Sequence, residues 1–161
     1  MGQRNMSLEE TREKYANGYY AEKLEEGLRF QDVVTRELYL RGIVVVGYAS
    51  RAFQNAHGEN MLGAEIKRDG NFRKTGNLYI EVAEKTHPDN RTFVPSGIMR
   101  NDNSWLFVIG DEKTIWIFPT LYLRKLAHRY KQVGGHIGDT SIGRLMPTQD
   151  ADKYAIRRID I

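Results

Sequence analysis

Hydrophobic positions in the first quarter of the chain recur at helical spacing. Between residues 20 and 41, four apolar side chains fall near one face of a helix: Leu24, Leu28, Val34 and Leu38. The other positions of this stretch are mostly charged, and Gly42 supplies a stop signal. The pattern therefore predicts a helix over 20–41 that packs its apolar face on the core. A shorter polar helix is predicted over 7–17.

Apolar runs after this helix predict strands. Residues 43–49 (IVVVGYA) are β-branched and almost wholly apolar, which is typical of a strand covered on both faces at the centre of a sheet. Two further strands are predicted over 61–69 and 77–85. The turn-rich residues between them predict a hairpin. A second hairpin is predicted from 105–110 and 114–119.

The remaining pattern completes a single α/β domain over residues 1–161, with a mixed central sheet flanked by helices. A short helix is predicted around 96–101 and a longer one over 120–130. The tail predicts a strand near 142–146, followed by a final helix or strand. We expect the sheet to contain the strands near 43–49, 61–69, 77–85 and 105–109.

Composition narrows the class of protein without fixing its function. The chain has 161 residues, 40% of them hydrophobic and 28% charged, which excludes a disordered chain and predicts a soluble, folded one. The absence of cysteine excludes disulfides and cysteine-ligated metals. With no signal peptide or membrane-spanning run in the sequence, a cytoplasmic, intracellular location is expected. A net charge of +3 permits a polyanionic partner but does not demonstrate one.

Strand parity points to a pair of carboxylates. Glu65 and Lys67 share one face of the strand 61–69, and Glu81 lies on the polar face of the strand 77–85. In a hairpin whose flanking residues pair, Glu65 lies directly opposite Glu81. Two adjacent carboxylates repel unless a proton or a cation lies between them, and oxygen ligands suit magnesium or manganese. The same parity also fits a solvated face with alternating charges.

The residues around these carboxylates resemble a known family. Gly63-Ala64-Glu65-Ile66, followed sixteen residues after Glu65 by Glu81 in the run YIEV, is similar to the PD-(D/E)xK nuclease superfamily. The pattern of that superfamily is Gly-Pro-Asp-Ile and then a strand with Glu-x-Lys. Residues 31–42 (QDVVTRELYLRG) are similar in spacing to the first helix of archaeal Holliday-junction resolvases. The resemblance covers roughly residues 20–110 and implies a restriction-endonuclease-like fold.

The resemblance also implies site residues, with two departures. The metal ligands would be Glu65, Glu81 and Gln31, although Gln31 stands where the resolvases have a glutamate, and only its amide oxygen could ligate. Ala83 stands where the superfamily has its catalytic lysine. Lys67 or Lys85 could replace that lysine, and the sequence does not choose between them. The implied activity is a magnesium- or manganese-dependent DNA endonuclease that hydrolyses phosphodiester bonds.

Basic residues near the predicted hairpin supply candidate DNA contacts. Arg68 lies on the strand that carries Glu65, Arg73 and Lys74 lie in the turn beyond it, and cations near a nuclease site bind backbone phosphates. Such a run can also be a solvated turn. Cutting both strands of a duplex with one small domain per site predicts a homodimer. The alternative function is a noncatalytic nucleic-acid-binding or interaction protein on a decayed nuclease scaffold.

Overall fold

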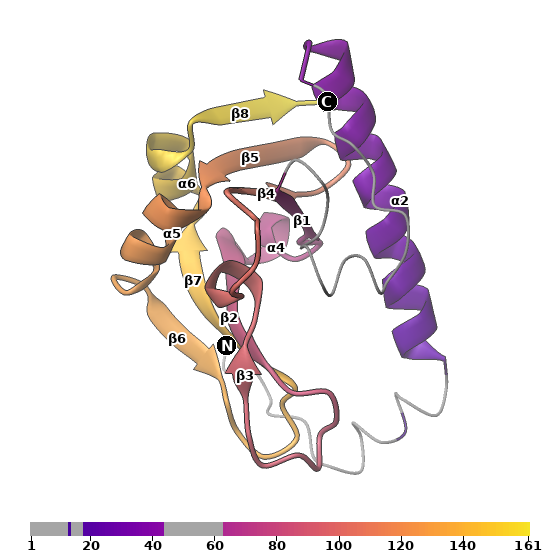
Figure 1. Ribbon diagram of the computed structural model, residues 1–161, viewed down its shortest axis with the longest axis vertical. Helices are drawn as coiled ribbons and strands as arrows, with labels where there is room; N and C mark the ends of the chain where they lie inside the picture. The colour runs from indigo at the N-terminus through magenta and orange to yellow at the C-terminus, as the bar shows by residue number, and fades with distance from the viewer. Residues whose placement is uncertain (1–12, 14–17, 44–62) are drawn as a thin grey trace.

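The computed structural model describes residues 13, 18–43 and 63–161. The helix predicted over 7–17 and the strand predicted over 43–49 lie almost entirely outside the described residues. The described chain contains two four-stranded sheets and flanking helices, as Figure 1 shows. The α/β class with a mixed sheet is therefore confirmed.

Sheet A is mixed and sheet B is antiparallel. Sheet A has the strand order β1 (Ala64–Arg68), β4 (Leu106–Gly110), β5 (Thr114–Pro119) and β8 (Arg157–Asp160), and only β1 and β4 run parallel. Sheet B has the order β3 (Val94–Pro95), β2 (Asn77–Glu84), β7 (Ser141–Pro147) and β6 (Lys131–Gly134). The helices are α2 (Tyr19–Leu40), α4 (Phe72–Thr75), α5 (Thr120–Ala127) and α6 (Thr148–Tyr154), with a 3-10 turn η1 (Gly97–Met99).

Several predicted elements are confirmed close to their expected bounds. Helix α2 ends before Gly42, whose φ of 77° is left-handed backbone that glycine adopts without strain. The hairpin of β4 and β5 has the predicted strands, and η1, α5 and β7 lie where a helix or strand was expected. The tail contains both a helix, α6, and a strand, β8. Strand β6 was not predicted.

The hairpin predicted from 61–69 and 77–85 is wrong, because β1 and β2 belong to different sheets. Strand β1 pairs in parallel with β4, and β2 pairs with β3 and β7. The chain leaves sheet A at Asp69, whose side chain accepts backbone N–H bonds from Asn71, Phe72 and Tyr79. These bonds start α4 and hold the beginning of β2 against the end of β1. The carboxylate of Asp69 thus connects β1 to β2, which share no ladder of backbone hydrogen bonds.

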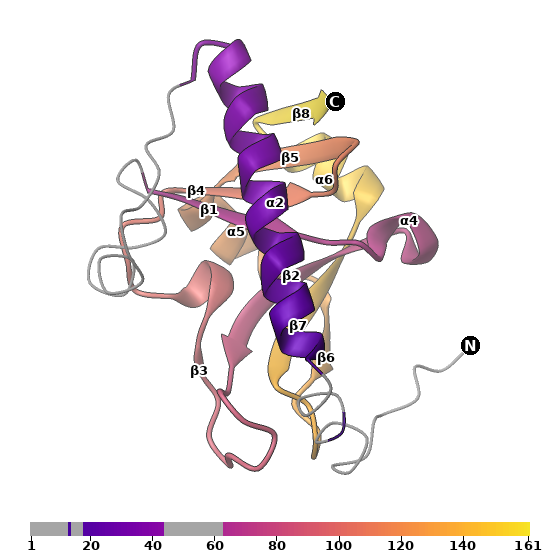
Figure 2. The same cartoon turned by 90° about the vertical axis from the view of Figure 1, so that its right-hand side faces the viewer.

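The core lies on both faces of sheet A. One face is covered by α2, where Phe30, Val34 and Leu38 pack with Val108 and the neighbouring apolar residues of β5. The other face packs against sheet B, α5 and α6. Figure 2 shows α2 crossing in front of sheet A. The single sheet that the sequence predicted is therefore replaced by two sheets that share a core.

The two halves of α2 have different surroundings. Its second half is buried against sheet A, but Leu24 and Leu28 in its first half are 56% and 41% exposed. The prediction that these two leucines face the core is wrong, because the first half of α2 extends beyond sheet A toward β2 and β7 (Figure 2). This extension forms one wall of the cleft described below. In residues 18–43 and 63–161, no helix is long and apolar enough to cross a membrane.

Candidate functional site

Glu65 and Lys67 lie on the same face of β1, as strand parity predicted. Glu65 is 1% exposed, and its Oε1 lies 3.1 Å from Nζ of Lys67. Burial of a carboxylate is costly unless a charged or hydrogen-bonding partner compensates it. The Lys67 side chain is 37% exposed, so its ammonium reaches solvent while it contacts Glu65. The pair therefore joins a buried acid to an accessible cation.

Glu81 of β2 approaches the same ammonium from sheet B. Its Oε1 lies 4.0 Å from Nζ of Lys67, and its side chain is 21% exposed. The two carboxylates thus meet around one ammonium group, although their strands do not pair. Lys67 and Glu81 both line the open cleft described below, where β1 and β2 approach each other. The predicted pairing of Glu65 opposite Glu81 is wrong, and both carboxylates instead contact Lys67 from different sheets.

Ser96 is a site residue that sequence reasoning missed. Its side chain is 2% exposed, and its hydroxyl donates a hydrogen bond of 2.6 Å to Oε1 of Glu81. A hydrogen bond to a charged acceptor is among the stronger ones in proteins. Ser96 lies fifteen residues after Glu81 in an irregular segment, and no local pattern marks a serine there as a partner of a strand carboxylate.

The turn that carries Ser96 is seated on β2. The backbone N–H of Ser96 donates to the carbonyl of Val82, and Gly97 has a φ of 51°. A Cβ at Gly97 would lie 2.4 Å from the carbonyl oxygen of Glu81, so only glycine permits this approach. The pairing of β2 with β7 shifts register between Glu81 and Ala83, which is the mark of a bulge. The turn and the bulge together orient Glu81.

An open cleft of about 610 Å³ gives access to this cluster. Its walls are the first half of α2, the end of β1 and the start of β2, and its lining includes Gln31, Lys67 and Glu81. Gln31, the third ligand that the resemblance implies, thus lines the same cleft as Glu81. Glu26 also lines the cleft, but its Oε2 accepts from Lys23 at 2.6 Å and from Arg68 at 3.3 Å.

Tyr79 forms the floor of the cleft beside Glu81. Its hydroxyl lies 2.8 Å from Oγ of Ser141, and its ring fills the space over Gly143. Burial raises the pKa of Tyr79 and the Glu81 carboxylate adds to this, while the hydrogen bond with Ser141 opposes it. Tyr79 is therefore a neutral hydrogen-bonding group near neutral pH.

Of the two candidate lysines, the structure brings Lys67 to the carboxylates. Lys85 is 8% exposed, and its ammonium donates to the carbonyl of Pro88 at 2.8 Å and lies 5.0 Å from the centroid of the Phe93 ring. These contacts hold the loop that follows β2. Ala83, at the superfamily's lysine position, pairs with Pro95 of β3. We therefore exclude Lys85 from the site and keep Lys67.

The cations proposed for DNA contact differ in their partners. Nε of Arg68 lies 2.7 Å from Oε1 of Glu112. The guanidinium of Arg73 donates to the carboxylate of Asp111, with one bond of 2.8 Å. Burial of Asp111 opposes ionisation, but the bonds from Arg73 and from two backbone N–H groups of the turn hold its pKa below the usual range. Lys74 is exposed on α4. Two of the three cations are thus neutralised by neighbouring carboxylates.

The donor set fits a hard divalent cation in type. Two carboxylates and one amide oxygen, from Glu65, Glu81 and Gln31, are the oxygen ligands that magnesium and manganese prefer. Magnesium keeps several waters, so a site with few protein ligands suffices. Among the residues that the structure describes, no group of three or more His, Asp or Glu side chains is placed to hold a metal.

The comparisons with known proteins assign no relative. Neither a family model, nor a curated protein, nor a solved structure matches this chain. The function is therefore inferred from the geometry of the site itself.

Proposed function

We propose that this protein is a magnesium- or manganese-dependent DNA endonuclease of the PD-(D/E)xK type. The observation that carries the proposal is the cluster of Glu65, Lys67 and Glu81, in which two carboxylates from different sheets lie within 4.0 Å of one ammonium beside an open cleft. An acidic pair with an adjacent lysine is the arrangement that the superfamily uses for phosphodiester hydrolysis. The restriction-endonuclease-like fold is part of the same proposal.

Each residue has a distinct role in the proposed reaction. Glu65 and Glu81, with the amide oxygen of Gln31, are the ligands that hold the cation, which supplies Lewis acidity toward the scissile phosphate when bound. Glu65 is fixed by burial, and Glu81 is fixed by its bond from Ser96. Both ligands are therefore set in place before substrate arrives, which limits the cost of reorganisation.

Lys67 acts on the substrate side of the cluster. Its partly exposed ammonium lines the cleft, where it donates hydrogen bonds to phosphate oxygens and offsets the charge that develops as water attacks. Before a cation binds, the same ammonium offsets part of the negative charge of the two carboxylates. Lys67 thus takes the role that the superfamily gives to the lysine of Glu-x-Lys, from β1 of sheet A instead of from the strand that carries Glu81.

A second candidate is a noncatalytic nucleic-acid-binding protein on a nuclease scaffold. The observation that favours it is the contact of Lys67 with both carboxylates, because the ammonium already separates and partly compensates them without any metal. In that case the cluster would be structural, joining sheet A to sheet B. Cleavage decides between the two candidates.

The test is cleavage of supercoiled plasmid and of a four-way junction in magnesium, in manganese and in EDTA. We expect cutting that depends on the metal and is lost in Glu65→Gln and Glu81→Gln. The matched control is Glu84→Gln, which changes another half-buried carboxylate of β2 and should cut normally. Cutting that survives Glu81→Gln would show that the site is elsewhere. Binding of DNA with no cutting of either substrate would favour the noncatalytic protein.

A further inference from the structure

The side of the molecule away from α2 carries exposed cations. We call it the α5–α6 basic face and define it by one residue of α5, one after α5, one of β6 and one of α6: Lys125, Arg129, Lys131 and Lys153. All four are exposed, and none forms an ion pair with another residue of the described chain. Their charges are therefore available to an external partner, unlike those of Arg68 and Arg73.

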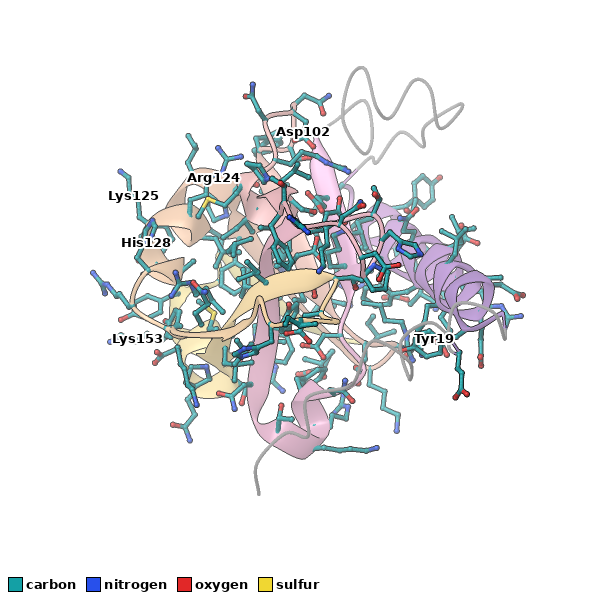
Figure 3. All side chains as sticks on the ribbon, turned by 90° about the horizontal axis from the view of Figure 1, so that it is seen from below. Tyr19, Asp102, Arg124, Lys125, His128 and Lys153 are labelled. Atoms are coloured by element: carbon teal, nitrogen blue, oxygen red, sulfur yellow. The ribbon has the colours of Figure 1, made fainter. Side chains whose placement is uncertain are left out.

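An aromatic contact joins the two helices of this face. The rings of Tyr122 on α5 and Tyr154 on α6 meet edge to face, with centroids 6.4 Å apart. Lys125 lies one turn after Tyr122, and the ammonium of Lys153 lies 4.9 Å from the centroid of the Tyr154 ring. Figure 3 shows Lys125 and Lys153 pointing outward on the side opposite α2. The cations of both helices therefore share one surface.

The backbone beneath this face is well anchored. Leu123 and Ala127 of α5 are buried in the core between the sheets, and so is Ala151 of α6. Arg124, the other cation of α5 beside Lys125, is turned inward and donates to the carbonyls of Ile98 and Arg100. Of the two carboxylates of α6, Asp152 accepts from Trp116 and Arg158, and Asp150 interacts with the hydroxyl of Tyr130. Lys125 and Lys153 are thus displayed from anchored helices, and neither forms an ion pair within the described chain.

We infer that the α5–α6 basic face binds the phosphate backbone of DNA, away from the cleft that holds Glu81. Clustered cations on one face are the electrostatic footprint of a polyanion, and the half-exposed ring of Tyr122 offers a surface to sugars and bases. The choice of DNA over another polyanion rests on the proposed function. Because the face and the cleft lie on different sides, this contact engages a segment of DNA other than the one being cut.

Fluorescence anisotropy with a labelled duplex in EDTA tests this inference, because binding is then measured without cleavage. The test variant is Lys125→Glu with Lys153→Glu. The matched control is Lys113→Glu with Arg91→Glu, which reverses two exposed cations outside the α5–α6 basic face. Circular dichroism and the urea midpoint verify that both variants fold.

Loss of two phosphate contacts should reduce the slope of log affinity against log salt by about 1.8. If the test variant and the wild type bind DNA with equal affinity at 1 M salt, this change in slope lowers the DNA affinity of the test variant roughly 60-fold at 0.1 M salt. The DNA affinity of the control variant should fall by a several-fold smaller factor. Equal losses in both variants would overturn the inference in favour of a net-charge effect, and so would unchanged affinity in the test variant. Tighter binding to phosphatidylserine vesicles than to DNA through the same face would also overturn it.

The outcome is separable from that of the proposed function. If the basic face binds DNA but the plasmid stays uncut in both metals, the inference holds and the endonuclease proposal fails. If the plasmid is cut and the test variant binds DNA as the wild type does, the endonuclease proposal holds and the inference fails.

Discussion

Replacement of Lys67 by methionine tests the ion-pair cluster directly. The substitution keeps most of the side-chain volume and removes the ammonium that lies 3.1 Å from Glu65 and 4.0 Å from Glu81. The gross attraction at 3.1 Å is about 5 kcal/mol at an effective dielectric constant of 20. Lys67 is 37% exposed, so water screens part of this attraction, and we expect a net loss of about 2 kcal/mol in the free energy of unfolding.

Urea unfolding followed by tryptophan fluorescence measures this loss. With a slope of about 2 kcal/mol per molar urea, the midpoint of Lys67→Met should fall by about 1 M. Lys74→Met, at an exposed lysine of α4, should change stability by less than about 0.5 kcal/mol. A midpoint for Lys67→Met equal to that of the Lys74→Met control would refute the reasoning, because the buried Glu65 would then not depend on Lys67.

The same urea unfolding is repeated with magnesium present for Lys67→Met and for the wild type. Removal of the ammonium leaves two carboxylates that a divalent cation can bridge, so magnesium should stabilise Lys67→Met more than it stabilises the wild type. A ligand at 100 times its dissociation constant adds about 2.7 kcal/mol to the stability of the protein it binds. Saturating magnesium should therefore restore the urea midpoint of the variant. An absence of any magnesium effect on the urea midpoint of the variant would contradict a cation site at these carboxylates.

Three further predictions concern the surroundings of the cluster. Ser96→Ala removes the 2.6 Å hydrogen bond to Glu81, so it should lower the free energy of unfolding by about 2 kcal/mol and slow cleavage. Unchanged cleavage would show that Ser96 does not orient Glu81. Gly97→Ala should lower the free energy of unfolding by at least about 2 kcal/mol, because the new Cβ would lie 2.4 Å from a carbonyl oxygen. Gly27→Ala, which has open space around it in α2, should raise the free energy of unfolding by about 0.5–1 kcal/mol. Shifts of the urea midpoint in the same direction for both variants would refute this. Asp111 has a lowered folded pKa, so it contributes stability above its unfolded pKa of about 3.9 that is lost as the pH falls through the folded value. Asp111→Asn should therefore be less stable than the wild type at pH 7, with a difference that narrows below about pH 4; a deficit independent of pH in urea titrations would contradict the assignment.

Local patterns along the chain predicted the elements well where periodicity and stop signals agree. The helix over 20–41 has an apolar stripe and Gly42, and α2 matches it within one residue. The strands over 61–69 and 77–85 likewise contain β1 and β2. Strand parity correctly put Glu65 and Lys67 on one face, because alternation of side chains is a property of a strand alone.

Pairing between strands could not be predicted in the same way. The seven residues after Asp69 fit a hairpin loop, but they also fit the short helix α4, and the choice depends on the carboxylate of Asp69 that binds three backbone N–H groups. The two carboxylates still reach one ammonium, because Lys67 of β1 and Glu81 of β2 line the same cleft although their strands are in different sheets. Ser96 could not be found at all, since its bond to Glu81 depends on the path of an irregular segment.

The most direct measurement is a titration of manganese into the protein, in which electron paramagnetic resonance reports the concentration of the free ion. It shows whether two carboxylates from different sheets form a cation site. The wild type should bind one manganese ion per chain, Glu65→Gln and Glu81→Gln should each lose that binding, and Glu84→Gln should retain it. Binding that is the same in all four proteins would contradict the account.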